Sequence, residues 1–167
     1  MLEVCAEHAK LAGVHLDLRL GDLRDPPVDE RVPLVIIPFR SLLHLNTDGE
    51  RRRGLRAVRR LLAPGGRFVF DVFTPSREDI QETNGRWLER EPEIFERADW
   101  DDGARTLTLS VRGGGRASTM ELAWLDAAEW RALLESEGFA IEACYGWFDG
   151  RPYTGGEDTI WVARLSP

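Results

Sequence analysis

Cysteine is scarce in this chain. Only Cys5 and Cys144 occur among 167 residues, and neither belongs to a Cys-x-x-Cys pair or to a Cys/His cluster with the spacing of zinc ligands. A disulfide framework or a structural zinc site is therefore not expected, and we assign no metal ligand. This use of cysteine fits the reducing cytoplasm.

Long apolar runs and an excess of positive charge are missing as well. No segment approaches the roughly 18 apolar residues of a membrane-spanning helix, and the acidic start Met1–His8 lacks the basic-then-apolar layout of a signal peptide. The chain carries 22 basic and 29 acidic side chains, a formal net charge of −7. Such a balance does not suit binding to a phosphate backbone by bulk charge. We therefore expect a cytoplasmic protein with no nucleic-acid partner and no membrane partner.

The length and the 43% hydrophobic content indicate one globular domain spanning residues 1–167. Its first part alternates helical and strand patterns. Apolar spacing predicts a helix from Leu2 to Gly13, strict alternation predicts a strand at Val14–Leu20, and a continuous apolar run predicts a buried strand at Leu34–Ile37. A capping box of Thr47 and Glu50 then opens a helix, which ends at Pro64 before a strand at Arg67–Phe73. Strand, helix and strand with short breaks are typical of a doubly wound α/β sheet.

The pattern changes after Pro75. Residues from about 86 to 125 predict an antiparallel β unit, in which a glycine-rich turn at Gly113–Gly115 joins two alternating strands. Six apolar side chains should share one buried face of this unit: Leu107, Leu109, Val111, Met120, Leu122 and Trp124. A helix from Asp126 to Gly138 and strands at 139–147 and 159–165 close the chain.

Four motifs, taken in order, carry a family resemblance. They are Met1-Leu2, Leu20-Gly21-Asp22-Leu23, the stretch from Leu34 through Ser41 and His44 to Leu45, and the stretch from Leu61 through Pro64-Gly65-Gly66 to Phe70. Together they resemble the middle and C-terminal parts of a class I S-adenosylmethionine-dependent methyltransferase of the small-molecule type, such as the dimethylaminosugar enzymes. The resemblance implies a Rossmann-like sheet with an antiparallel insertion after its fifth strand. It also implies S-adenosylmethionine as cofactor and methyl transfer to a small-molecule substrate by in-line displacement, which depends on proximity and alignment.

The sequence departs from this family at its N-terminus. The family begins with a strand, a glycine-rich loop, a helix and a second strand that ends in a ribose-binding acid, and none of these precedes Val14. We therefore expect an N-terminally truncated methyltransferase that is inactive by itself. The alternative is a non-catalytic fragment or degenerate domain that associates with another chain. In the family the sheet order is 3-2-1-4-5-7-6, so the first two strands lie between the third and fourth. Without them, the strands at Val14–Leu20 and Leu34–Ile37 should lack their neighbours. We expect these two strands either to pair directly with each other or to be buried in a homodimer, and we favour the homodimer.

The resemblance also implies cofactor-binding residues. Asp22 would accept a hydrogen bond from the adenine amino group beside the Leu23 amide, and Met1 would pack on the adenine face. Phe39 and Arg40 follow the fourth strand and would contact the methionine arm of the cofactor or the substrate. The alternatives are a loop aspartate that caps its own turn, a disordered terminus and a surface ion pair.

His44 and Asp71 are the candidate catalytic residues. A neutral imidazole at His44 could take a proton from the acceptor, and Asp71, at the end of a strand, could act as base or hold a substrate amine. The alternative for His44 is a structural histidine at a helix start. Three aromatic residues in irregular segments, Trp87, Trp147 and Tyr153, are candidates for a substrate lid.

Overall fold

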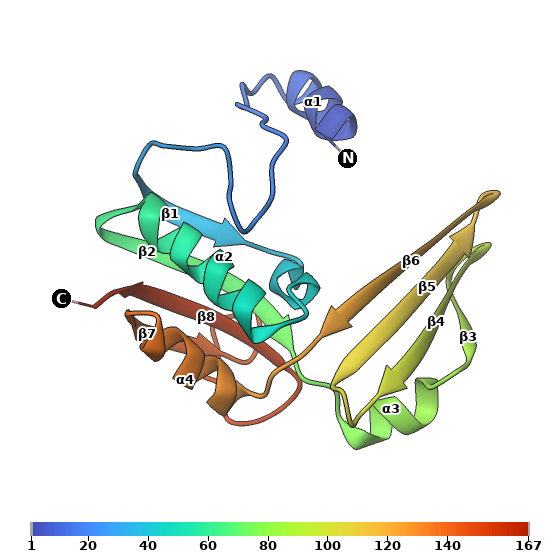
Figure 1. Ribbon diagram of the computed structural model, residues 1–167. Coiled ribbons are helices and arrows are strands. Elements are labelled where there is room, and N and C mark those ends of the chain that lie inside the picture. The colour runs from blue at the N-terminus through green and yellow to red at the C-terminus, as the bar shows by residue number, and fades with distance from the viewer. Residues whose placement is uncertain (1, 167) are drawn as a thin grey trace.

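Two four-stranded sheets make up the body of the protein in the computed structural model, which describes residues 2–166 (Figure 1). The first sheet contains β1 (Val32–Ile37), β2 (Leu62–Phe73), β8 (Asp158–Leu165) and β7 (Phe139–Tyr145), in that order. β1 and β2 are parallel, and β8 runs antiparallel to both of its neighbours, β2 and β7. This is the order that the resemblance implies for the fourth, fifth, seventh and sixth strands of the family sheet.

Helices cover one face of this sheet. Figure 1 shows α2 (Asp48–Leu61) over β1 and β2, and α4 (Ala127–Ser136) over β7 and β8, on the same side. The core between them contains large side chains that are almost fully buried, among them Phe68, Phe70, Phe139, Trp130 and Trp161. Phe70 connects this cluster, because its ring lies 4.9 Å from Phe68 and 5.4 Å from Trp130 between centroids.

Capping boxes open both helices. Thr47 accepts a hydrogen bond from the Glu50 amide, and the Glu50 carboxylate accepts one from the Thr47 amide. Asp126 and Glu129 form the same pair at α4. The box predicted at Thr47 is thus confirmed. α2 ends at Leu61, before the predicted stop at Pro64, and β2 begins directly at Leu62.

The second sheet is an antiparallel meander of β3 (Trp87–Glu91), β4 (Ile94–Asp101), β5 (Thr106–Gly113) and β6 (Arg116–Ala123), which confirms the predicted β insertion. The β5–β6 turn places Gly114 and Gly115 at positive φ, as a two-residue hairpin turn requires. Leu107 pairs with Leu122 and Leu109 with Met120 in register. Of the six predicted side chains, Leu107, Leu122 and Trp124 are buried and Leu109, Val111 and Met120 are half-buried, so burial falls toward the hairpin tip.

The prediction of a strand at Val14–Leu20 is wrong. α1 (Leu2–Leu11) forms as expected, but the segment after it pairs with no strand among residues 2–166, and Figure 1 shows both apart from the two sheets. Val14, Leu16, Leu18 and Leu20 are all exposed, Leu20 by 86%. A strand is stabilised by a hydrogen-bonded neighbour, and this segment has alternation without one. β1 is correspondingly an edge strand, with Leu34 and Ile36 exposed by 47% and 56%.

The remaining elements join the two sheets. The short 3-10 helix η1 (Ser41–His44) follows β1, and α3 (Arg77–Thr83) connects β2 to the meander. No helix of the described part of the chain is long and apolar enough to cross a membrane.

Candidate functional site

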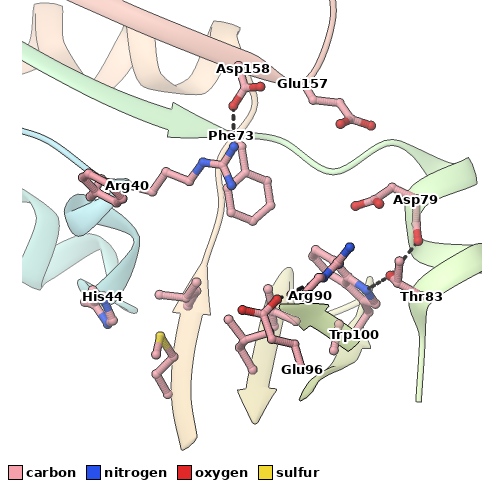
Figure 2. Close-up of a pocket in the computed structure, with 16 residues that line it drawn as sticks. Arg40, His44, Phe73, Asp79, Thr83, Arg90, Glu96, Trp100, Glu157 and Asp158 are labelled. Atoms are coloured by element: carbon pink, nitrogen blue, oxygen red, sulfur yellow. Dashed lines mark hydrogen bonds and ion pairs between the residues drawn. The ribbon is translucent and has the colours of Figure 1, made fainter. Parts of the chain in front are cut away.

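A cavity of about 410 Å³ lies between the two sheets, and we refer to it as the large cavity (Figure 2). Its apolar wall is the inward face of the meander together with the last residue of β2, and includes Phe73, Trp100, Leu107 and Leu122. Phe73 and Trp100 meet edge to face, with ring centroids 6.2 Å apart. The volume is in the range of small-molecule binding pockets, which are commonly apolar with a few placed polar groups.

Charged side chains surround this apolar wall. Two of them form ion pairs with arginine: Asp158 Oδ1 lies 2.7 Å from Arg40 Nη2, and Glu96 Oε2 lies 3.1 Å from Arg90 Nε. Two further carboxylates of the lining, Asp79 and Glu157, form no ion pair within residues 2–166. Two arginines thus face four carboxylates, and the cavity has an excess of negative charge.

Asp79 and Glu157 lie on the same side of the large cavity, away from His44 (Figure 2). The Glu157 carboxylate accepts a hydrogen bond of 3.2 Å from the Ser76 amide. Burial, together with the nearby Glu157 charge, raises the pKa of the Asp79 carboxyl above its ordinary value. A positive charge placed between the two groups would attract both carboxylates and favour their ionised forms.

Trp100 is fixed at this end of the cavity by α3. Its indole Nε1–H donates to Thr83 Oγ1 at 2.8 Å, and the Thr83 hydroxyl donates to the backbone oxygen of Asp79 at 2.7 Å. The aromatic ring therefore has a defined orientation, and it lines the same cavity as Asp79.

A second cavity, of about 310 Å³ and here called the small cavity, lies at the carboxyl ends of β1 and β2. Asp71, Trp147 and Phe148 line it, together with Phe39, Arg40 and Asp158, which also line the large cavity. Trp147 and Phe148 pack edge to face at 5.4 Å and are both exposed. The two cavities thus share one wall.

The backbone of that wall is strained. Phe39 and Arg40 have φ of 59° and 56°, in the left-handed region, although neither is glycine. Such residues cost about 1–3 kcal/mol each and persist where the surroundings hold them. Here the Arg40 amide donates to Asp71 Oδ2 at 3.1 Å, and the Ser41 hydroxyl donates to the Pro38 oxygen at 2.6 Å.

The predicted site residues fall into three places. His44 is exposed at the end of η1 and lines the large cavity, whereas Asp71 lines the small one. Phe39 and Arg40 border both. The two candidate catalytic groups therefore do not share a cavity, and Arg40 lines the boundary between their two cavities.

Asp22 and Leu23 lie outside both cavities. The Asp22 carboxylate accepts hydrogen bonds from the Arg24 amide and guanidinium, with the shortest contact 2.7 Å, and these hold the pKa of Asp22 at about 2. This is the arrangement of an aspartate that caps its own turn. The predicted role of Met1 lies outside the described residues.

The candidate lid aromatics divide similarly. Trp147 lines the small cavity, whereas Trp87 lies under the Arg112 guanidinium at 4.1 Å and Tyr153 donates to the Gly156 oxygen. Sequence reasoning missed Asp79, Glu157 and Asp158 as site residues. Asp158 is the first residue of β8, which pairs with the end of β2. Predicting that pairing would have placed Asp158 beside the predicted residues at the end of β2.

The glycine pattern limits what the described residues can bind. A dinucleotide or S-adenosylmethionine cradle of the Rossmann type needs a glycine-rich turn between a strand and a helix. Within residues 2–166 the glycine run lies instead at the tip of the β5–β6 hairpin, and there a Cβ on Gly113 would lie 2.7 Å from the Glu93 oxygen. Among the described residues, no glycine-rich turn of this kind lies between a strand and a helix.

The fold is that of the class I methyltransferases. A S-adenosylmethionine-dependent methyltransferase from Clostridium acetobutylicum superposes with a TM-score of 0.85 at 14% sequence identity, over 99% of this chain and 71% of that chain. The CcbJ methyltransferase from Streptomyces caelestis gives a TM-score of 0.75 at 23% identity, over 89% of this chain and 63% of its own.

CalS10, an amino pentose methyltransferase from Micromonospora echinaspora, gives a TM-score of 0.59 at 20% identity, over 87% of this chain and 63% of its own. The chain thus spans 63% to 71% of the length of these three proteins. No protein-family model and no curated protein matches it. At these identities the likeness establishes the fold, and this confirms the fold that the motifs predicted.

Proposed function

We propose that this chain forms the acceptor-binding part of a S-adenosylmethionine-dependent methyltransferase that acts on a small molecule carrying an amine. One observation carries the proposal: within this fold, the large cavity joins an aromatic wall to two carboxylates that lack an ion-pair partner among residues 2–166. An amine with an apolar body fits both surfaces, since a cation is attracted by carboxylates and by aromatic faces. CalS10 is an amino pentose methyltransferase, and an amino pentose is one molecule of this class.

The residues then have distinct roles. Trp100 and Phe73 bind the body of the acceptor, and Asp79 and Glu157 orient its amine. His44 lies on the opposite side of the large cavity from Asp79 and Glu157 (Figure 2), where its imidazole can receive a proton from a reacting nitrogen or oxygen of the acceptor. Asp71 acts on the small-cavity side, where it holds the Arg40 amide.

S-adenosylmethionine, when bound, supplies an electrophilic methyl group. Phe39, at the end of β1, would border it, and Asp22 would have to exchange its Arg24 contacts for the adenine amino group. Because the described residues provide no glycine-rich turn between a strand and a helix, we expect the 167-residue chain to bind S-adenosylmethionine weakly. Calorimetric titration is the measurement, and a micromolar dissociation constant would contradict this expectation.

Acceptor binding is tested separately with glucosamine and glucose, which differ only in an ammonium and a hydroxyl group. The reporter is the Trp100 indole N–H signal in a ¹H–¹⁵N spectrum. Glucosamine should shift it and glucose should not, and Asp79→Asn should weaken the glucosamine effect. Glu78→Gln is the matched control, because Glu78 is the preceding residue of α3 and is exposed outside the cavity. Equal responses to both sugars, or no response to either, would refute the proposed acceptor class.

A non-catalytic role is the second candidate. It is favoured by the hydrogen bonds that engage the Asp22 carboxylate with Arg24. In that case the chain would act through association with another chain. Methyl transfer from labelled S-adenosylmethionine to any amine in the presence of this chain would exclude it.

A further inference from the structure

Arg40 stands between the two cavities. Its neighbour Phe39 and its ion-pair partner Asp158 are the other residues that line both. On one side of Arg40 lies the aromatic wall around Trp100, and on the other lies the exposed pair Trp147 and Phe148. Arg40 is thus one of three residues that lie between an acceptor in the large cavity and that pair.

Three residues of the first sheet contact this arginine. Phe73 and Asp158 are opposite one another in the β2–β8 register, so their side chains lie on the same face, and Asp71 shares that face two residues earlier on β2. Arg40 uses all three: its amide donates to Asp71, its guanidinium pairs with Asp158 at 2.7 Å, and its Cζ lies 4.7 Å from the Phe73 ring centroid. Figure 2 shows the guanidinium extended across Phe73 to Asp158.

The backbone conformation supports the same interpretation. Two successive non-glycine residues in the left-handed region persist only where their surroundings hold them. Here the contacts of Arg40 with Asp71, Asp158 and Phe73 do so. A glycine at position 40 would adopt this φ without strain. The position holds an arginine whose guanidinium contacts Asp158 and the Phe73 ring, which indicates that the side chain itself has a role.

We propose that Arg40 is a specificity-determining residue, which confines the acceptor to the large cavity by closing the passage to the small cavity. For the identity of the ligand, this inference rests on the proposed function. For the position of Arg40 between the two cavities, it rests on the geometry alone. Asp71 and Asp158 act as positioning residues, because they hold Arg40 in place. The proposal thus gives the Asp71 carboxylate a role in addition to the base or amine anchor predicted from the sequence.

Arg40→Gly tests the wall, because it removes the side chain and suits the backbone. The probes are benzylamine and 4-phenylbenzylamine, which share the amine and differ by one ring. Trp100 reports on the large cavity and Trp147 on the small cavity, through their indole N–H signals. In the unchanged protein we expect benzylamine to shift Trp100 but not Trp147, and the longer amine to bind more weakly.

In the Arg40→Gly variant the longer amine should shift both indole signals with one dissociation constant, about tenfold below that of the unchanged protein, because its second ring becomes buried. Benzylamine should bind as before. Arg77→Ala is the control, since Arg77 is an exposed arginine of α3 that lines neither cavity. A longer amine that already shifts Trp147 in the unchanged protein, or that never does so in the variant, would overturn the proposal.

A crystal structure of Arg40→Gly gives a reading that needs no ligand. One continuous cavity is expected, and two separate cavities would overturn the inference. This result also separates the two proposals: if neither amine shifts Trp100, the proposed acceptor class fails, whereas the wall is still decided by the cavity of the variant.

Discussion

Glu137 offers a quantitative test of how the two helices on the first sheet are held together. Its carboxylate is only 5% exposed at the end of α4, and it accepts hydrogen bonds from two arginines of α2. Arg52 Nη1 donates at 2.9 Å, and Arg56 Nε and Nη2 donate at 2.8 and 3.1 Å. Glu137→Gln removes the charge and keeps the size of the side chain.

The expected loss is moderate. Breaking a buried ion pair costs about 3–5 kcal/mol when the remaining charge is left buried without a partner. Here Arg52 keeps Asp48 at 2.7 Å, and the Arg56 side chain is 66% exposed, so neither guanidinium is stranded. We therefore expect Glu137→Gln to lower the free energy of unfolding at pH 7 by about 2 kcal/mol. For a chain of this length that corresponds to a fall in Tm of about 4–8 °C.

The loss should depend on pH with a defined sign. Although burial opposes ionisation, the guanidiniums of Arg56 and Arg52 hold the pKa of the Glu137 carboxyl below its ordinary value of 4.5. The stabilisation is therefore fully present above pH 4.5, and it is lost as the pH falls through the lower folded-state pKa. We measure Tm by circular dichroism. By linkage, the difference in Tm between the unchanged protein and Glu137→Gln should shrink as the pH falls from about 5 to about 3. Glu135→Gln, an exposed change in the same helix, is the control. A difference that stays constant over this pH range would show that packing, not charge, is responsible.

Three further expectations follow from single features. Thr47→Ala should destabilise the protein by about 1 kcal/mol through loss of the α2 cap, measured by thermal unfolding, and an unchanged Tm would contradict the role of the capping box. Cys5 is exposed, whereas burial raises the pKa of the half-buried Cys144 to about 11, so Ellman's reagent at pH 8 should modify Cys5 in a fast phase and Cys144 in a slow one; equal rates would contradict this. The open edge of β1 and the exposed apolar side chains of Val14–Leu20 lead us to expect a homodimer in sedimentation velocity at micromolar concentration, and a well-behaved monomer would contradict that expectation.

Local features of the sequence predicted local structure well. The Thr47 capping box, the glycine hairpin turn and the alternation of Leu107 and Leu109 each depend on residues a few positions apart, so their pattern is sufficient to determine the outcome. The order of the first sheet also followed from the motifs, because the motifs resemble a fold whose strand order is fixed.

Val14–Leu20 shows the limit of such patterns. Its alternation of apolar and polar residues is that of a half-buried strand, yet the segment remains exposed and unpaired within the described chain. Alternation records which side chains would face a sheet. Whether the segment pairs with a sheet depends on residues distant in sequence, which a local pattern does not contain.

The candidate site depends on the same kind of long-range information. Arg40 and Asp158 are 118 positions apart, and only the pairing of β2 with β8 brings Asp158 opposite Phe73 and within reach of the guanidinium. From the sequence, Asp71 reads as a free carboxylate at the end of a strand, suited to act as a base. In the fold the same carboxylate accepts a hydrogen bond from the Arg40 amide, at the strained turn of Phe39 and Arg40. The sequence thus indicates the chemistry that each side chain can perform, whereas the pairing of the strands determines which groups that side chain contacts.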